Sequence, residues 1–309
     1  MPQIIGFESL RTASLIVDAI YEGDKDGQLS SEPISNLLPG CGNMGGFRIA
    51  GKQKDKLFVA LFTTGEDKDW PDRIDLTTGQ FIYYGDNKTP GHELHDTHKG
   101  GNLVLRRVFD LLHGSPPNRE LIPPFFIFQK CVTQKSARAV QFKGLAVPGH
   151  PSLSATGDLV AVWKTTANQR FQNYRSAFTI LDVPIVERTW LQNLKQPTDR
   201  LTNSPKTWAI WVQTGKYQPL TSEPTTLIRS IVDQTPDTDV KVAILKIIFE
   251  HFKESPTRLD VKRRLIQLWH QSLARDQKPQ SWTALLKLEQ RGQKKSGLYR
   301  RNGPLMQGG

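Results

Sequence analysis

An aromatic and acidic stretch in the first third of the chain has residue types that could read a nucleotide base. Trp70, Tyr83 and Tyr84 offer flat rings, and Asp72 and Asp75 offer carboxylates. A base taken out of a duplex is stacked against aromatic side chains and hydrogen-bonded along its Watson–Crick edge. A carboxylate can accept from the exocyclic amino group of cytosine. On residue types alone, an aromatic core flanked by turn-forming Asp and Gly is the favoured alternative.

Polar residues around this stretch are candidates for DNA contact. A Gly-rich turn at 40–48 lets a ligand approach the backbone closely and carries Asn43 and Arg48. It lacks the Gly-Lys-Ser/Thr ending of a phosphate-binding P-loop, so a plain tight turn is the alternative. Further candidates follow the aromatic stretch or lie in a segment that alternates basic and aromatic residues. They are Asp86, Asn87, Lys88, Arg170 and Arg175.

The metal-ligating residue types do not form a recognisable metal motif. His92, His95 and His98 recur every third residue, which differs from the one-turn helical spacing of a zinc protease. Only Cys41 and Cys131 are present, too few for a cysteine-based zinc site or a disulfide framework. We therefore expect no metal, no cofactor and a reducing compartment, with the cytoplasm as the default.

The positive charge is concentrated in the last third of the chain. The 309 residues carry a net charge of +11. Residues 1–190 hold 21 Lys and Arg against 20 Asp and Glu, whereas residues 191–309 hold 20 against 10. Such an excess favours a polyanionic partner, or a basic tail that aids solubility. Binding of nucleic acid by residues 1–190 must therefore depend on particular side chains and not on overall charge. No apolar run reaches the roughly 18 residues that a membrane span needs.

The elements that must position these residues are mainly strands. Alternating and continuous apolar runs bounded by turn residues predict strands at 56–62, 81–84, 124–128, 139–146, 159–163 and 175–181. Helical spacing predicts helices within 10–20 and at 102–112. Strands that enclose a helix indicate an α+β fold with a strongly bent sheet or barrel.

The segment after Pro184 changes in character. Trp190, Trp208, Trp211 and Tyr217 lie in a Pro- and Thr-rich region that we interpret as docking between domains. Helices are predicted at 239–252, 256–273 and 282–290. These patterns divide the chain into a domain at 1–220, a helical linker or accessory region at 221–290 and a basic tail at 291–309.

Several ordered blocks resemble the N-terminal recognition domain of the AspBHI-type modification-dependent restriction enzymes. They are GNMGGFR at 42–48, TGEDKDWPD at 64–72, YYGDNKTPG at 83–91, GGN at 100–102, PPFF at 123–126, GLAVPG at 144–149 and RFQNYR at 170–175. The resemblance implies an SRA-like (PUA-like) bent sheet with flanking helices. It also implies recognition of duplex DNA by flipping 5-methyl- or 5-hydroxymethylcytosine into a pocket of two aromatics and an aspartate.

The spacing of that pocket leaves two assignments open. In SRA domains one aromatic lies three residues before the aspartate and the other lies nine after it. Trp70, Asp75 and Tyr83 come near this spacing without matching it, and Asp72 and Tyr84 remain alternatives.

The nuclease of the resembled enzymes is not evident. Relatives usually carry a C-terminal PD-(D/E)xK nuclease, which needs carboxylates and a lysine on adjacent strands around Mg²⁺. Short matches such as Asp239-Val240-Lys241 and Asp260-Val261-Lys262 fall in helical patterns, and only 36 residues follow Leu273. We therefore expect a binding module that partners a nuclease domain or subunit, with a homo-oligomer left open. An Mg²⁺-dependent endonuclease and a non-specific nucleic-acid-binding protein are the alternatives.

Overall fold

The computed structural model describes residues 2–25, 27–51, 56–195 and 199–221. These residues belong to one compact unit, Met1–Ser222. The helices predicted at 239–252, 256–273 and 282–290, like the regions assigned to 221–290 and 291–309, lie outside the described residues apart from residue 221. In the part of the chain that is described, no helix combines the length and apolar character needed to cross a membrane.

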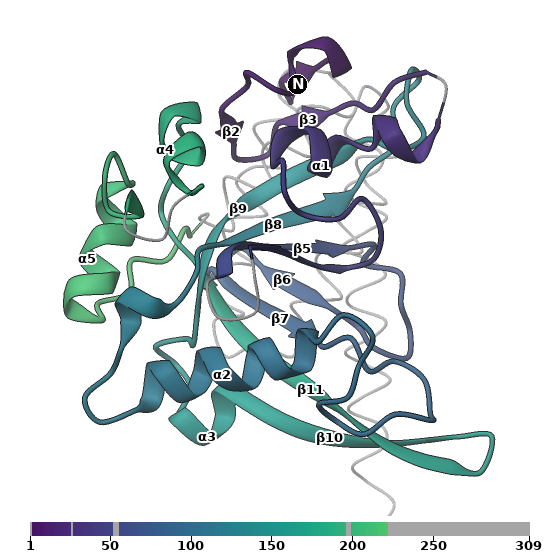
Figure 1. The fold of residues 1–309 in the computed structure, drawn as a ribbon, viewed down its shortest axis with the longest axis vertical. Helices are drawn as coiled ribbons and strands as arrows, with labels where there is room; N and C mark the ends of the chain where they lie inside the picture. The colour runs from purple at the N-terminus through teal and green to yellow at the C-terminus, as the bar shows by residue number, and fades with distance from the viewer. Residues whose placement is uncertain (1, 26, 52–55, 196–198, 222–309) are drawn as a thin grey trace, which may run out of the picture. The chain divides into compact units, whose positions relative to one another are not determined.

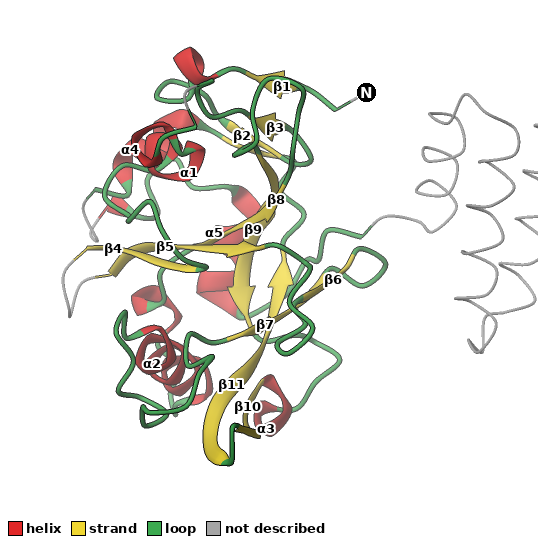
Figure 2. Cartoon of the chain, turned by 90° about the vertical axis from the view of Figure 1, so that its right-hand side faces the viewer, coloured by secondary structure: helices red, strands yellow, loops and turns green. Residues whose placement is uncertain are grey.

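A bent mixed sheet forms the centre of the unit (Figures 1 and 2). Its main path is β4 (Phe47–Gly51), β5 (Lys56–Thr63), β8 (Phe125–Lys130), β9 (Val140–Pro148), β11 (Gln169–Ile180), β7 (Gln80–Tyr84) and β6 (Arg73–Asp75). β10 (Leu159–Thr166) pairs with β11, and β3 (Ile20–Tyr21) joins β1 (Ile4–Ile5) to β9. A separate pair contains β2 (Leu15–Ile16) and β12 (Ile185–Val186).

The α+β class is confirmed, but the barrel alternative is wrong. The two ends of the main path, β4 and β6, do not pair with each other among the described strands, so the sheet stays open. The long strand β11 produces much of the bend, because different parts of it pair with β9, β7 and β10. Bending brings the end of β5 toward β7.

Helices and short 3₁₀ turns cover the sheet. The α-helices are α1 (Pro33–Leu37), α2 (Gly101–His113), α3 (Ala155–Asp158), α4 (Arg188–Asn193) and α5 (Lys206–Thr214). The 3₁₀ turns are η1 (Phe7–Ser9), η2 (Leu29–Ser31) and η3 (Arg119–Leu121). Leu105, Val108 and Phe109 form the buried face of α2, as expected for an amphipathic helix that packs on a sheet.

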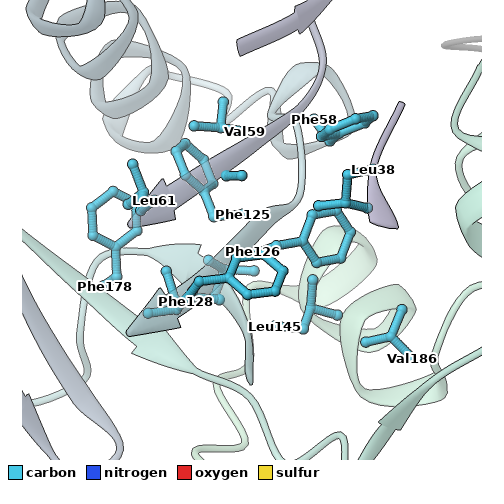
Figure 3. Packing of buried hydrophobic residues seen from close by; sticks show 14 of the residues in the cluster. Leu38, Phe58, Val59, Leu61, Phe125, Phe126, Phe128, Leu145, Phe178 and Val186 are labelled. Carbon is cyan, nitrogen blue, oxygen red and sulfur yellow. The ribbon is translucent and has the colours of Figure 1, made fainter. Parts of the chain in front are cut away.

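The core lies where the central strands are apolar on both faces. Phe125, Phe126 and Phe128 of β8 are fully buried, which explains why this strand reads as a continuous apolar run. Figure 3 shows these rings beside Phe178 of β11 and Phe58 of β5. The Phe125 and Phe178 ring centroids are 4.8 Å apart. This packing fixes the strands that carry the candidate site.

Six strands and the helix at 102–112 are confirmed within a few residues, except that β11 begins at Gln169 rather than 175. The helix predicted within 10–20 is wrong, because that segment forms β2 and β3 instead. The backbone N–H groups of this segment bond to residues of other segments: Asp18 N donates to Phe142 O and Ile20 N to Gln3 O. Asp18 also has a φ of 62°, which interrupts a right-handed helix.

The tryptophans of the segment after Pro184 belong to the core of this unit. Trp190, Trp208 and Trp211 are each at most 1% exposed, on α4 and α5. Trp190 packs against Trp208, with ring centroids 5.2 Å apart, and against Phe126 of β8. The interpretation of this segment as a docking region therefore gives way to a role in closing the core.

Candidate nucleic-acid interface

Asp72 is a half-buried carboxylate at the end of the loop from β5 to β6. Its Oδ1 accepts a hydrogen bond from the Tyr84 backbone N–H at 2.9 Å. Burial raises the pKa of Asp72, although hydrogen bonds from the Tyr84 backbone and the Thr63 side chain partly oppose this. The site therefore holds an oriented, partly desolvated acceptor, and partial desolvation strengthens a hydrogen bond made to it.

Trp70 lies two residues before Asp72, Tyr84 bonds to the carboxylate through its backbone N–H, and the rings of Trp70 and Tyr84 touch each other. Their ring centroids are 5.5 Å apart and their planes are inclined by 52°. A base between two parallel rings needs them about 7 Å apart, twice the 3.4 Å stacking distance. Trp70 is only 3% exposed. The two rings therefore cannot hold a base between them in this arrangement.

The Trp70 ring is held by two other segments. Its Nε1 donates to Lys88 O at 3.3 Å, and the Phe171 ring meets it with centroids 6.0 Å apart. Lys164 Nζ lies 5.0 Å from the centroid of the ring and 2.6 Å from Asp69 Oδ1. Trp70 therefore ties the loop from β5 to β6 both to the loop after β7 and to the β10–β11 hairpin.

Tyr83 points into the core on the other face of β7. It is 2% exposed and packs against the rings of Phe47 and Phe81. Burial raises the pKa of its hydroxyl strongly, and the negative charges of Asp72 and Asp86 raise it further. Its position is that of a supporting residue below the Asp72 carboxylate.

Asp75 lies at the opposite end of the β6–β7 hairpin from Tyr84, since it pairs in register with Gln80. Its Oδ1 accepts from the Thr77 backbone N–H at 3.0 Å and from the Thr77 hydroxyl at 2.6 Å. Burial alone would raise the pKa of Asp75, but these hydrogen bonds, one from Thr78 and the charge of Arg73 lower it. The structure therefore brings Asp72, and not Asp75, to the aromatic pair.

Asp86 and Asn87 hold the loop after β7. Asp86 Oδ1 accepts from Asn102 N at 2.9 Å, and its Oδ2 accepts from Gly101 N at 2.9 Å and from the Thr97 hydroxyl at 2.8 Å. Asp86 thereby caps the first turn of α2. Asn87 is 2% exposed and donates to Gln172 O and His92 O. Both side chains are used within the protein.

Arg48 and Asn43 shape the Gly-rich turn from inside. The Arg48 guanidinium is 2.8 Å from Glu32 Oε1 and donates to Gly45 O at 2.8 Å and to Gly42 O at 3.3 Å. Arg48 is 5% exposed. Asn43 donates to Leu29 O at 3.1 Å. Arg48 is thus turned inward, and the exposed side chain at the tip of the turn is Met44, which is 57% exposed.

The remaining basic candidates lie at the surface. Lys88 Nζ forms an ion pair with Asp67 Oδ2 at 2.9 Å. Arg175 is opposite Tyr84 in the β11–β7 register and is half-buried. Arg170 is exposed on β11, with its Cζ 4.3 Å from the centroid of the Trp163 ring.

Sequence reasoning did not select Lys164, although it contacts Trp70. Its partners lie 94 and 95 residues earlier in the chain, so no local pattern could have found it. The histidine loop likewise acquires its contacts from the fold: His95 Nε2 is 2.9 Å from the Tyr174 hydroxyl. Within the described ranges, no group of three or more His, Cys, Asp or Glu side chains could hold a metal ion.

Residues 15–223 match the family model described as restriction endonuclease AspBHI N-terminal. The chain belongs to this family. The matched range includes all the candidate residues, from Asn43 to Arg175. Two solved structures are similar to the chain in both sequence and fold.

The chain is 51% identical to the DNA recognition domain of the cytosine modification-dependent restriction endonuclease LpnPI, with a TM-score of 0.69. That alignment covers 72% of this chain and 98% of the other. The DNA modification-dependent restriction endonuclease AspBHI is 41% identical, with a TM-score of 0.65 over 72% of this chain and 100% of the other. A search of curated proteins found no match. The chain is thus homologous to DNA recognition domains of modification-dependent restriction endonucleases.

Proposed function

We propose that this chain binds duplex DNA containing 5-methyl- or 5-hydroxymethylcytosine and reads the flipped base with Asp72. The observation that carries the proposal is the half-buried Asp72 carboxylate, oriented by the backbone N–H of Tyr84, whose ring contacts Trp70. The relatives also support the proposal, because the chain is 51% identical to the DNA recognition domain of LpnPI, which is named as a cytosine modification-dependent restriction endonuclease.

The chemistry of the carboxylate suits cytosine. The exocyclic N4 amino group of cytosine is a donor, and a carboxylate is an acceptor without a proton to give. Thymine presents a carbonyl oxygen at the corresponding position, which a carboxylate would repel. Asp72 already accepts from the Tyr84 N–H and the Thr63 side chain, and we assign a remaining lone pair of the carboxylate to the base.

The aromatic pair would have to open when a base enters. Tyr84 is half-buried and can offer a ring face, whereas Trp70 is covered on several sides. We therefore assign stacking to Tyr84 and propose that the Trp70 ring shifts away from it. The shift would exchange the contact between the two rings for stacking of the base on Tyr84.

The test is binding to two duplexes of one sequence, with and without a single 5-methylcytosine. We expect tighter binding to the methylated duplex, and we expect Asp72→Ala to abolish the difference between the two affinities. Asp75→Ala is the matched control, because this carboxylate lies at the far end of the same hairpin. Equal affinity of the wild-type chain for both duplexes, in several sequence contexts, would rule the proposal out.

We further propose that recognition by this chain directs a nuclease domain or subunit against cytoplasmic DNA. The support is that both solved relatives are named as restriction endonucleases or as a domain of one. Incubation of the purified chain with methylated plasmid and Mg²⁺ distinguishes a nuclease activity within this chain from a nuclease on a separate subunit. Unchanged plasmid supports a separate nuclease, and cleavage would place the activity in this chain.

A further inference from the structure

The β10–β11 hairpin is a positively charged ribbon that extends from the body of the unit (Figure 1). Its strands pair over eight residues, from Leu159 opposite Ser176 to Thr166 opposite Gln169. Between 159 and 176 it contains Lys164, Arg170 and Arg175 and no Asp or Glu. The rest of residues 1–190 is nearly neutral, so this ribbon is a local concentration of charge.

Trp163 is an exposed aromatic residue on this ribbon. It is 56% exposed, whereas the other tryptophans among the described residues are at most 3% exposed. An exposed indole contributes little to folding, and Trp is enriched where proteins bind partners. The Arg170 guanidinium lies 4.3 Å from the centroid of the ring, at a stacking distance. One face of the indole is therefore covered by a cation, and the other remains available.

We propose that Trp163 and Arg170 contact the sugar–phosphate backbone of duplex DNA beside the modified base, an inference that rests on the proposed function. The free indole face packs against a deoxyribose, and the guanidinium pairs with a neighbouring phosphate. An indole with one face already covered by Arg170 is not free to insert between two base pairs. This contact therefore adds affinity without reading sequence or modification.

The ribbon is connected to the reading site through the next residue. Lys164 follows Trp163 but lies on the opposite face of the strand, where it contacts Trp70 and Asp69. The face of the ribbon that carries Lys164 is therefore covered by the loop from β5 to β6, and the face that carries Trp163 remains exposed. One face then supports the reading loop while the other holds the backbone.

The test measures the affinity of the full chain for methylated and unmodified duplexes over a range of salt concentrations. Trp163→Ala should weaken binding to both duplexes by the same factor, about tenfold, because a stacking contact is lost. It should leave the salt dependence unchanged. Arg170→Ala should reduce the slope of log affinity against log salt by about one, as expected for one lost phosphate contact.

Leu121→Ala is the control, because Leu121 is an exposed apolar residue (60%) on η3 and not on the hairpin. This variant should bind both duplexes like the wild type. Trp163→Phe should retain part of the affinity. Wild-type affinity of Trp163→Ala for both duplexes would overturn the proposal, as would a loss confined to the methylated duplex. If the wild type fails to distinguish the duplexes but Trp163→Ala still weakens both, the backbone contact stands and the modified-base proposal falls.

Discussion

Asp72 directly precedes the short strand β6 and Asp75 is its last residue, yet the two carboxyl groups have opposite environments. Burial raises the pKa of Asp72, whereas hydrogen bonds from Thr77 and Thr78 lower that of Asp75 despite its partial burial. A carboxyl with a raised pKa costs stability when it ionises, which is a common property of binding and catalytic groups. Asp75 instead stabilises its turn.

This difference gives Asp72→Asn an expected effect on stability. Because the pKa of Asp72 is raised in the folded state, its contribution is most favourable below the ordinary value of 3.8 and is lost as the pH rises through the raised pKa. Asp72→Asn should therefore unfold at a higher temperature than the wild type at neutral pH while losing discrimination of modified DNA. Thermal unfolding followed from acid to neutral pH measures the difference.

Asp75→Asn should show the reverse sign. The lowered pKa of Asp75 makes its contribution present above the ordinary value and absent at lower pH, so the variant should be less stable than the wild type at neutral pH. If both variants shifted the unfolding temperature in the same direction at neutral pH, the assigned environments would be wrong.

Gly85 is required by close packing behind the site. A Cβ at this position would lie 1.7 Å from Asn102 Oδ1 and 2.7 Å from Asn173 Oδ1. Both asparagines are fully buried and bonded to each other. Gly85→Ala should therefore reduce the free energy of unfolding by about 1–3 kcal/mol. Urea denaturation checks this, with Gly6→Ala as the control because nothing lies within 4 Å of its Cβ; equal stability of the two variants would contradict the packing argument.

At the scale of elements, α2 depends on a cap supplied from another segment. Asp86 bonds to the backbone N–H groups of Gly101 and Asn102, which have no partner within the helix. We expect Asp86→Ala to lower the free energy of unfolding by about 1–2 kcal/mol through loss of the cap. Any loss of DNA affinity should follow this loss of stability.

The control for that prediction is on the same helix. Asp110 forms an exposed i,i+4 ion pair with Arg106, and such pairs contribute at most about 0.5 kcal/mol. Asp110→Ala should thus be nearly neutral in the same denaturation experiment. A direct DNA contact by Asp86, instead of a cap, would show as weaker binding by a variant of unchanged stability.

At the scale of the whole molecule, most of the net positive charge and the candidate base-reading residues lie in different parts of the chain. Residues 1–222 carry 25 Lys and Arg against 21 Asp and Glu, and residues 223–309 carry 16 against 9. The LpnPI recognition domain covers 72% of this chain, and the family model matches residues 15–223. Residues 1–222 by themselves should therefore keep the ratio of affinities for methylated and unmodified DNA. Their total affinity should be lower at low salt, because fewer phosphates are neutralised.

Binding by residues 1–222 and by the full chain, measured at two salt concentrations, tests this separation. Loss of the affinity ratio in the shorter chain would show that residues after 222 contribute to reading the base. Loss of all binding would favour the non-specific alternative, in which the basic last third carries the interaction.

The sequence by itself determined the α+β class, six of the strands, α2 and the family. Apolar runs and turn residues are local signals, and ordered blocks such as those at 64–72 and 83–91 need no coordinates to be compared. The tertiary structure decided which candidate side chains meet. The strand register places Asp72 opposite the end of β7 and Asp75 beside Gln80. Strand pairing also makes residues 15–16 and 20–21 strands, where the local pattern predicts a helix. These outcomes depend on contacts between residues distant in the chain, which no local spacing encodes.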